Sequence, residues 1–172
     1  TPTNSCLGTL DPAKISKLEW SGEHLAGDPP SKEAFLHSAI YETRPQAGAV
    51  VHTHSTYTAA VSCLSGLDPA NCLPPLTPYF VMKIGRLALI RYYRPGDKAL
   101  GDAVRALNGK YSAVLLSNHG PVVSAKNLES AIYASEELEE TSKIFLLLRN
   151  APTSCLNDAQ VDELKTAFKL DF

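Results

Sequence analysis

The sequence predicts a single α/β domain in which three layers are arranged around a central sheet. Short apolar, β-branched segments are interspersed with amphipathic helical ones, without the strict strand–helix–strand alternation of a parallel fold. Hydrophobic residues make up 44% and charged residues 20% of the chain, which is ordinary globular usage and excludes a disordered or fibrous protein. Residues 1–172 contain no repeat, linker or second domain.

The first half of the chain predicts two helices around a buried strand. Two prolines interrupt the segment before Ser31, which can then cap a helix that ends before Arg44. Residues 49–54 are short, apolar and β-branched, as in a buried strand. A second helix is expected over 56–64, and four prolines indicate a loop over 67–78.

The second half predicts further strands and a helix between them. Residues 87–93 are expected to form a strand, and leucine and valine at helical spacing indicate a helix over 98–107. An apolar strand over 113–117 runs into a Gly-Pro turn, after which 122–123 resume the sheet.

The longest helix is expected to begin after Asn127, which can cap it. Its apolar stripe is expected to consist of Leu128, Ile132, Ser135, Leu138, Ser142, Phe145 and Leu148. A last helix follows, because Asn157 and Gln160 have the spacing of a capping box.

Charge and cysteine usage exclude several classes of partner. Sixteen Lys and Arg against eighteen Asp and Glu give a net charge of -2, so the basic surface typical of nucleic-acid binding is missing. No apolar run approaches the roughly 20 residues that cross a bilayer. The four cysteines have no CxxC spacing and are expected to be reduced. Together with the lack of an apolar leader, this favours a cytoplasmic location.

Two histidines that lie two residues apart are the most informative feature. In a strand, His52 and His54 would face the same side, close enough to share one cation. Alone, such a pair is equally consistent with two partly exposed strand histidines. His119 follows another apolar strand, at a position where strand ends deliver functional side chains. Three imidazoles with an open fourth position are typical of a catalytic zinc site.

Glu33 has two interpretations. It lies in the first turn of the helix after Ser31, where a carboxylate is favoured by the helix dipole and commonly completes a capping box. It can also face the metal, either as a ligand or as the group that moves a proton. The residue types and their spacing leave both open.

Four short motifs carry a resemblance to a known family, and they occur in the order Thr1-Pro2-Thr3-Asn4, Ser31-Lys32-Glu33, His52-Thr53-His54 and Asn118-His119-Gly120. Over nearly its whole length the chain resembles the class II aldolase and adducin-head family. This resemblance implies an α/β/α fold with a mostly antiparallel central sheet. It also implies that zinc, or another divalent metal, is held by the three histidines, with Glu33 as a ligand or acid/base.

The resemblance also implies a phosphate site. Thr3 and Ser31 match positions that hold the substrate phosphate in the family. Asn4 replaces the glycine usual in the aldolases, and Lys32 replaces a second serine, which adds a positive charge beside a phosphate. The family's Gly-Asn-hydrophobic-Ser motif is absent from these residues, so we expect a further segment before Thr1 that carries it.

Residues 76–97 depart from the aldolases and epimerases. They are similar to the branch that decarboxylates 3-oxo-tetronate 4-phosphate to dihydroxyacetone phosphate and carbon dioxide, which implies a zinc-dependent carboxy-lyase. A sugar-phosphate aldolase (an aldehyde-lyase, as for fuculose phosphate) or epimerase (as for ribulose phosphate) is the first alternative. A non-catalytic adducin-like module is a more remote one.

The same region is the most basic window of the chain, and it either helps to hold an anionic substrate or forms a solvated rim; its cations are Lys83, Arg86, Arg91, Arg94 and Lys98. The resemblance further implies a homotetramer with active sites between subunits, completed by a tyrosine of the adjacent chain. Tyr57 and Tyr79 are the candidates.

Overall fold

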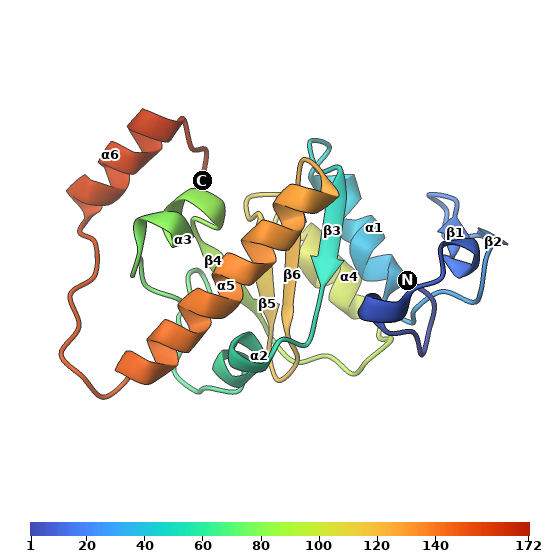
Figure 1. Cartoon of the computed structure of the whole chain (residues 1–172), viewed down its shortest axis with the longest axis horizontal. Helices are drawn as coiled ribbons and strands as arrows, with labels where there is room; N and C mark the ends of the chain where they lie inside the picture. The colour runs from blue at the N-terminus through green and yellow to red at the C-terminus, as the bar shows by residue number, and fades with distance from the viewer.

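A computed structural model describes residues 1–172 and has a four-stranded mixed sheet at its centre (Figure 1). The strands lie in the order β3 (Ala49–His52), β6 (Pro121–Ala125), β5 (Ala113–Leu116) and β4 (Leu87–Ile90). The β3–β6 and β6–β5 pairs are antiparallel, whereas β4 and β5 are parallel. The predicted α/β class is confirmed, and the sheet is mostly antiparallel with one parallel pair.

The strand directions place three strand ends at one edge of the sheet. Because β3 and β5 are both antiparallel to β6, they run the same way, and β4 is parallel to β5. The carboxyl ends of β3, β4 and β5 therefore lie together, and we call this the C-terminal edge. Side chains that follow these strands are brought to one place although they are far apart in the sequence.

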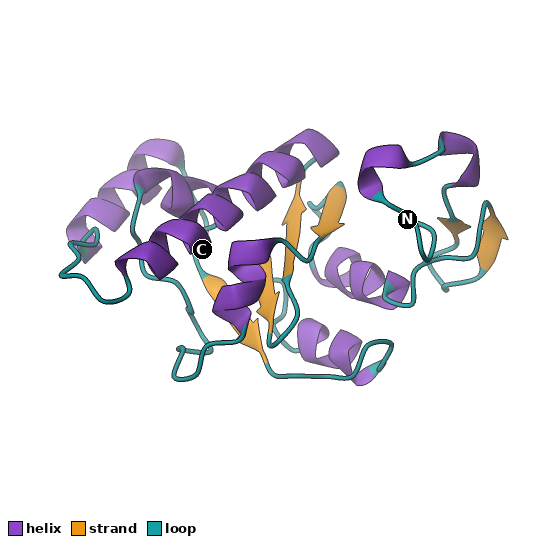
Figure 2. Ribbon diagram, turned by 60° about the horizontal axis from the view of Figure 1, so that its bottom comes forward, coloured by secondary structure: helices purple, strands orange, loops and turns teal.

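Helices pack against the sheet through two separate hydrophobic clusters (Figure 2). Val114 and Leu116 of β5 pack with α1 (Ala34–Thr43) and α4 (Ala99–Arg105). The alternate residues of β5 join the other cluster, which includes residues of α2 (Thr56–Ser62), α3 (Pro78–Lys83) and α5 (Leu128–Leu148). Each fully buried valine or leucine contributes roughly 1.5–3 kcal/mol through removal of its surface from water.

The helix before β3 starts later than its sequence suggests. α1 begins at Ala34, and Glu33 occupies the N-cap position without capping through its side chain. The predicted cap, Ser31, instead accepts a hydrogen bond from the Glu33 backbone N–H at 3.3 Å. The expected capping role of Ser31 is therefore wrong, because a turn separates it from the helix. This leaves the Glu33 carboxylate free to point elsewhere.

A short helix was not expected in the proline-rich region. The loop runs only to Thr77, and α3 begins at Pro78. The Thr77 side chain accepts a hydrogen bond from the Phe80 N–H, and Pro78 lies in the first turn, where its missing N–H costs nothing. The start of α3 was missed because Pro78 was counted as a loop residue.

The long helix α5 is capped as predicted but buries only part of the predicted stripe. Asn127 accepts a hydrogen bond from the Ser130 N–H at 2.8 Å. Leu128 and Ile132, expected on the apolar stripe, are 59% and 42% exposed. The buried positions are Ala131, Ala134, Leu138, Thr141 and Ser142. The predicted stripe left out Ala131 and Ala134, whose small side chains let the helix approach the sheet closely.

The two ends of the chain lie on opposite sides of the sheet (Figure 1). Two short 3-10 helices, Leu7–Thr9 and Pro12–Lys14, and the two-stranded sheet β1 (Lys17–Leu18) and β2 (His24–Ala26) come before α1. At the other end, α6 (Asp158–Phe168) starts with the predicted capping box. All four cysteines are free, as expected. No helix has the length and apolar character needed to cross a membrane.

A half-buried carboxylate fixes the start of α2. Glu139 of α5 accepts hydrogen bonds from the backbone N–H of Tyr57 at 2.7 Å, and from the N–H and hydroxyl of Thr58 at 2.8 and 2.6 Å. Burial alone would raise the pKa of Glu139, but the donated hydrogen bonds outweigh it and lower the pKa. The ionised carboxylate thus anchors α2 to α5.

We expect Glu139→Ala to lower the free energy of unfolding at pH 7 by about 1.5–3 kcal/mol, because hydrogen bonds to a charged acceptor are lost. The stabilisation is complete above the unfolded-state pKa of about 4.3 and disappears as pH falls through the lower folded-state pKa. Urea unfolding at pH 7 and in acid measures the difference. Glu136→Ala, on an exposed position of the same helix, is the control. If Glu139→Ala lowered the free energy of unfolding as much in acid as at pH 7, the stabilising role of the ionised carboxylate would be contradicted.

Candidate metal centre

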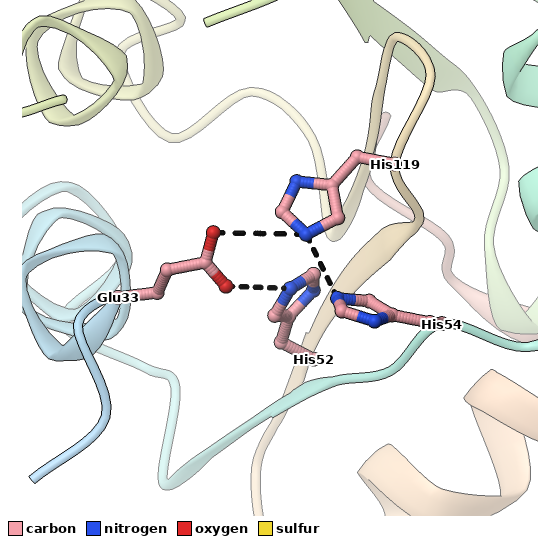
Figure 3. A group of neighbouring side chains, drawn as sticks. All are labelled: Glu33, His52, His54 and His119. Atoms are coloured by element: carbon pink, nitrogen blue, oxygen red, sulfur yellow. Dashed lines mark hydrogen bonds and ion pairs between the residues drawn. The ribbon is translucent and has the colours of Figure 1, made fainter. Parts of the chain in front are cut away.

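Three histidines meet at the C-terminal edge of the sheet (Figure 3). β3 ends at His52, His54 follows just beyond it, and His119 lies in the turn between β5 and β6. The ring centroid of His52 lies 5.2 Å from that of His54 and 4.9 Å from that of His119, and the last two are 4.6 Å apart. The predicted proximity of the pair is confirmed, although only His52 belongs to the strand.

Backbone pairing fixes the ring of His52. His52 pairs with Val122 across the β3–β6 ladder, beside Pro121. Its Nδ1 lies 2.8 Å from the Pro121 carbonyl oxygen, so Nδ1 carries a proton and donates it there. The other ring nitrogen, Nε2, therefore points into the cluster. This is the arrangement by which proteins orient a metal-ligating imidazole.

Glu33 completes the group from the start of α1. Its Oε2 lies 3.1 Å from His52 Nε2 and its Oε1 lies 3.6 Å from His119 Nε2. The side chains of Glu33 and His52 are only 12% and 9% exposed. Of the two interpretations of Glu33, the geometry favours the functional one, because the carboxylate faces the imidazoles and caps no backbone N–H.

The surroundings lower the pKa values of Glu33, His119 and His37. A hydrogen bond with His52 and the nearby imidazoles lower the pKa of Glu33, although burial opposes this. Burial lowers the pKa of His119. His37, one helical turn after Glu33, has its pKa lowered to about 4, chiefly by burial and then by His52. Sequence reasoning missed His37, which lies in the first turn of α1, four residues after Glu33.

Two polar atoms of the cluster are buried without a hydrogen-bond partner. One ligand atom from each of the four residues lies within 4.8 Å of all the others. His52 Nε2 and Glu33 Oε1 are buried without a hydrogen-bond partner, and His119 Nε2 lies 2.8 Å from His54 Nε2. Buried polar atoms without a partner call for a proton or a cation beside them. Three imidazole nitrogens and one carboxylate oxygen suit zinc and other divalent metals, so this group could hold one.

The predicted phosphate residues lie next to Glu33. An antiparallel bridge joins Pro2 to Pro30, and the Thr3 N–H donates to the Pro29 carbonyl at 2.9 Å. Thr3, Asn4 and Lys32 are exposed, and Ser31 is half-buried. The structure therefore gathers the four predicted residues in two adjoining segments that lead into the metal cluster.

The basic window is divided by β4. Arg91, Arg94 and Lys98 follow β4 at the C-terminal edge, and Gly96 between them lies beside Lys32, since a Cβ placed on Gly96 would be 4.0 Å from the Lys32 Cβ. Lys83 precedes β4 and lines a different cavity, of about 230 Å³, with Arg44 and Lys110. Four strand residues, about 13 Å, separate the two ends. Within one chain, the structure does not bring Lys83 to the cluster.

The candidate tyrosines are exposed. Tyr57, in the first turn of α2, is 38% exposed, and Tyr79, in the first turn of α3, is 63% exposed. Neither hydroxyl makes a hydrogen bond within the chain. Both side chains are therefore accessible to another molecule. Their contribution to the site of an adjacent subunit stays a prediction.

Comparisons with known proteins agree with this geometry. The chain is 48% identical over 166 residues to the 3-oxo-tetronate 4-phosphate decarboxylase of Escherichia coli strain K12, covering 96% of this chain and 78% of that protein. It is 30% identical to the L-fuculose phosphate aldolase of the same organism, covering 98% and 78%. The crystal structure of YgbL, a putative aldolase/epimerase/decarboxylase from Escherichia coli, superposes with a TM-score of 0.93 at 47% identity, covering 96% and 80%.

The sequence profile of one family spans most of the chain. It matches residues 1–146, which include all four residues of the cluster and the four predicted phosphate residues. Together with the close relatives, this match shows that the chain belongs to the class II aldolase and adducin N-terminal domain family.

Proposed function

We propose that the protein is a metal-dependent carboxy-lyase that converts 3-oxo-tetronate 4-phosphate to dihydroxyacetone phosphate and carbon dioxide. The observation that carries this proposal is the group of Glu33 and three histidines, in a chain 48% identical to a decarboxylase of that substrate. The lyase class follows from the relatives, and the particular substrate rests on the higher identity to the decarboxylases than to the aldolases.

The metal ligands in this proposal are His52, His54 and His119, and zinc is the metal that their chemistry suits best. A divalent cation bound there supplies a Lewis acid that polarises the substrate ketone and stabilises the charge left by decarboxylation. The Pro121 carbonyl holds His52 in the tautomer that offers Nε2.

Glu33 is proposed to move the proton that the reaction requires. Cleavage of the bond between C1 and C2 releases carbon dioxide and leaves its electron pair on C2, conjugated with the C3 ketone. Addition of one proton at C2 then gives dihydroxyacetone phosphate. Glu33 lies at the metal cluster and can deliver this proton directly or through a water that it orients.

The phosphate is proposed to lie against the segments that precede Glu33. Thr3, Asn4 and Ser31 offer hydroxyl and amide groups there, and Lys32 adds a positive charge. Arg91 and Arg94 follow β4 at the same edge of the sheet and increase the positive potential that an anionic substrate meets.

We also infer a three-layer α/β/α domain over residues 1–172. Its support is the division of the core into two clusters, one built with α1 and α4 and the other with α2, α3 and α5. A homotetramer with sites between subunits remains part of the proposal, supported by the exposed Tyr57 and Tyr79.

An aldolase of the same family is the alternative function, favoured by the 30% identity to L-fuculose phosphate aldolase. Aldol cleavage also leaves an electron pair beside a ketone, so the same metal cluster serves either reaction. The difference must then lie in the groups that surround the bond that breaks.

We expect the purified, zinc-loaded protein to release dihydroxyacetone phosphate from 3-oxo-tetronate 4-phosphate, and to lose this activity on dialysis against a chelator. A coupled assay for dihydroxyacetone phosphate measures the rate, with fuculose 1-phosphate and ribulose 5-phosphate compared in parallel. A faster reaction with either sugar phosphate would replace the decarboxylase proposal with the aldolase or epimerase alternative.

We expect Glu33→Gln to lower kcat by about 100- to 10,000-fold, the usual contribution of a general acid or base. Zinc content, measured by mass spectrometry, should stay near that of the wild type because the three imidazoles remain. His119→Ala should instead lose zinc, and Glu42→Gln, on the exposed far end of α1, should change neither property. Full loss of zinc in Glu33→Gln would make Glu33 an indispensable ligand rather than a proton carrier.

A further inference from the structure

The turn that carries His119 is tightly constrained. Asn118 has a positive φ of 55°, in the left-handed region that few residues adopt. A Cβ on Gly120 would lie 2.3 Å from the Thr53 carbonyl oxygen, so the turn approaches the chain after β3 as closely as glycine allows. Small shifts of this turn would therefore move His119 relative to His52 and His54.

One buried serine holds two successive amides of this turn. The Ser62 hydroxyl oxygen accepts a hydrogen bond from the His119 N–H at 3.1 Å, and the Ser62 carbonyl accepts one from the Asn118 N–H at 3.0 Å. The same hydroxyl donates to the Ala59 carbonyl at 2.6 Å, which fixes its direction. Ser62 is 3% exposed, so no water competes for these bonds.

Ser62 also ends the helix that begins beside His54. Ser55 is the N-cap of α2, and Ser62 is its last residue, seven helical residues or about 10 Å away. Glu139 anchors the first turn of α2 to α5. One short, anchored helix thus connects the chain leaving His54 with the turn that carries His119. The Nε2 atoms of these two histidines lie 2.8 Å apart.

We propose that Ser62 is a positioning residue for the metal centre and acts through the backbone of His119. Without the Ser62 hydroxyl, the His119 N–H keeps only the Leu116 carbonyl, at 3.1 Å, as acceptor. The hydrogen bonds between Ser62 and the turn then fall from two to one. Metal sites depend on ligand placement within about 0.5 Å. Loss of an outer partner of a ligand typically weakens metal binding 10- to 100-fold. The inference rests on the proposed role of the histidines as metal ligands.

Cobalt(II) binding tests the proposal, because its affinity and visible absorption spectrum report ligand geometry without any substrate. We expect Ser62→Ala to bind cobalt 10- to 100-fold more weakly than the wild type in competition with a chelator, with altered visible bands. Ser62→Cys keeps the branching of the side chain, with a slightly larger atom, but offers only a weak acceptor, so it should change affinity in the same direction.

Ser142→Ala is the matched control. Ser142 is also fully buried in a helix and donates its hydroxyl to a backbone carbonyl, that of Leu138 at 2.7 Å, but its side chain makes no hydrogen bond to the turn. Its cobalt affinity and spectrum should equal those of the wild type, even where thermal unfolding shows a similar loss of stability.

Wild-type cobalt affinity in either folded Ser62 variant, or an equal loss in Ser142→Ala, would overturn the positioning role. Failure of the proposed function gives a different result. If the wild type binds no cobalt, the metal centre itself is refuted. If it binds cobalt but does not decarboxylate the substrate, only the proposed reaction fails, and the comparison of variants still decides the role of Ser62.

Discussion

The protein brings together a carboxylate and three imidazoles, and it leaves one oxygen and one nitrogen of this group buried without a hydrogen-bond partner. His52 Nδ1–H donates a hydrogen bond to the Pro121 carbonyl, which directs Nε2 toward a Glu33 oxygen 3.1 Å away. Buried acceptors that face each other are costly unless a proton or a metal ion lies between them. This constraint connects the fold to the chemistry, since the β3–β6 ladder sets the His52 ring and the turn before β6 sets His119.

The mixed sheet explains why the remaining groups gather at the same place. The parallel pair β4–β5 requires a crossover through α4, and its first loop begins where β4 ends, at the C-terminal edge. Arg91 and Arg94 therefore belong to the surroundings of the metal cluster, whereas Lys83 precedes β4 and does not. A sequence window that reads as one basic patch is split by the four strand residues inside it.

Much of this site could be predicted because its residues occur in local motifs. The spacing of His52 and His54, and the place of His119 after an apolar strand, are visible in the sequence, and the structure brings them together. The role of Ser62 could not be predicted, because a helical serine carries no local signal for a turn more than fifty residues later. The buried face of α5 was misjudged for a related reason, since the value of Ala131 and Ala134 depends on how closely the sheet approaches.

Anomalous X-ray diffraction at the zinc edge, on crystals of the protein grown with zinc, tests the metal centre most directly. The expected result is a single strong peak within roughly 2.0–2.2 Å of one nitrogen of each of His52, His54 and His119. No peak at this position, with the imidazoles hydrogen-bonded to one another or to water instead, would contradict the metal centre and the function built on it.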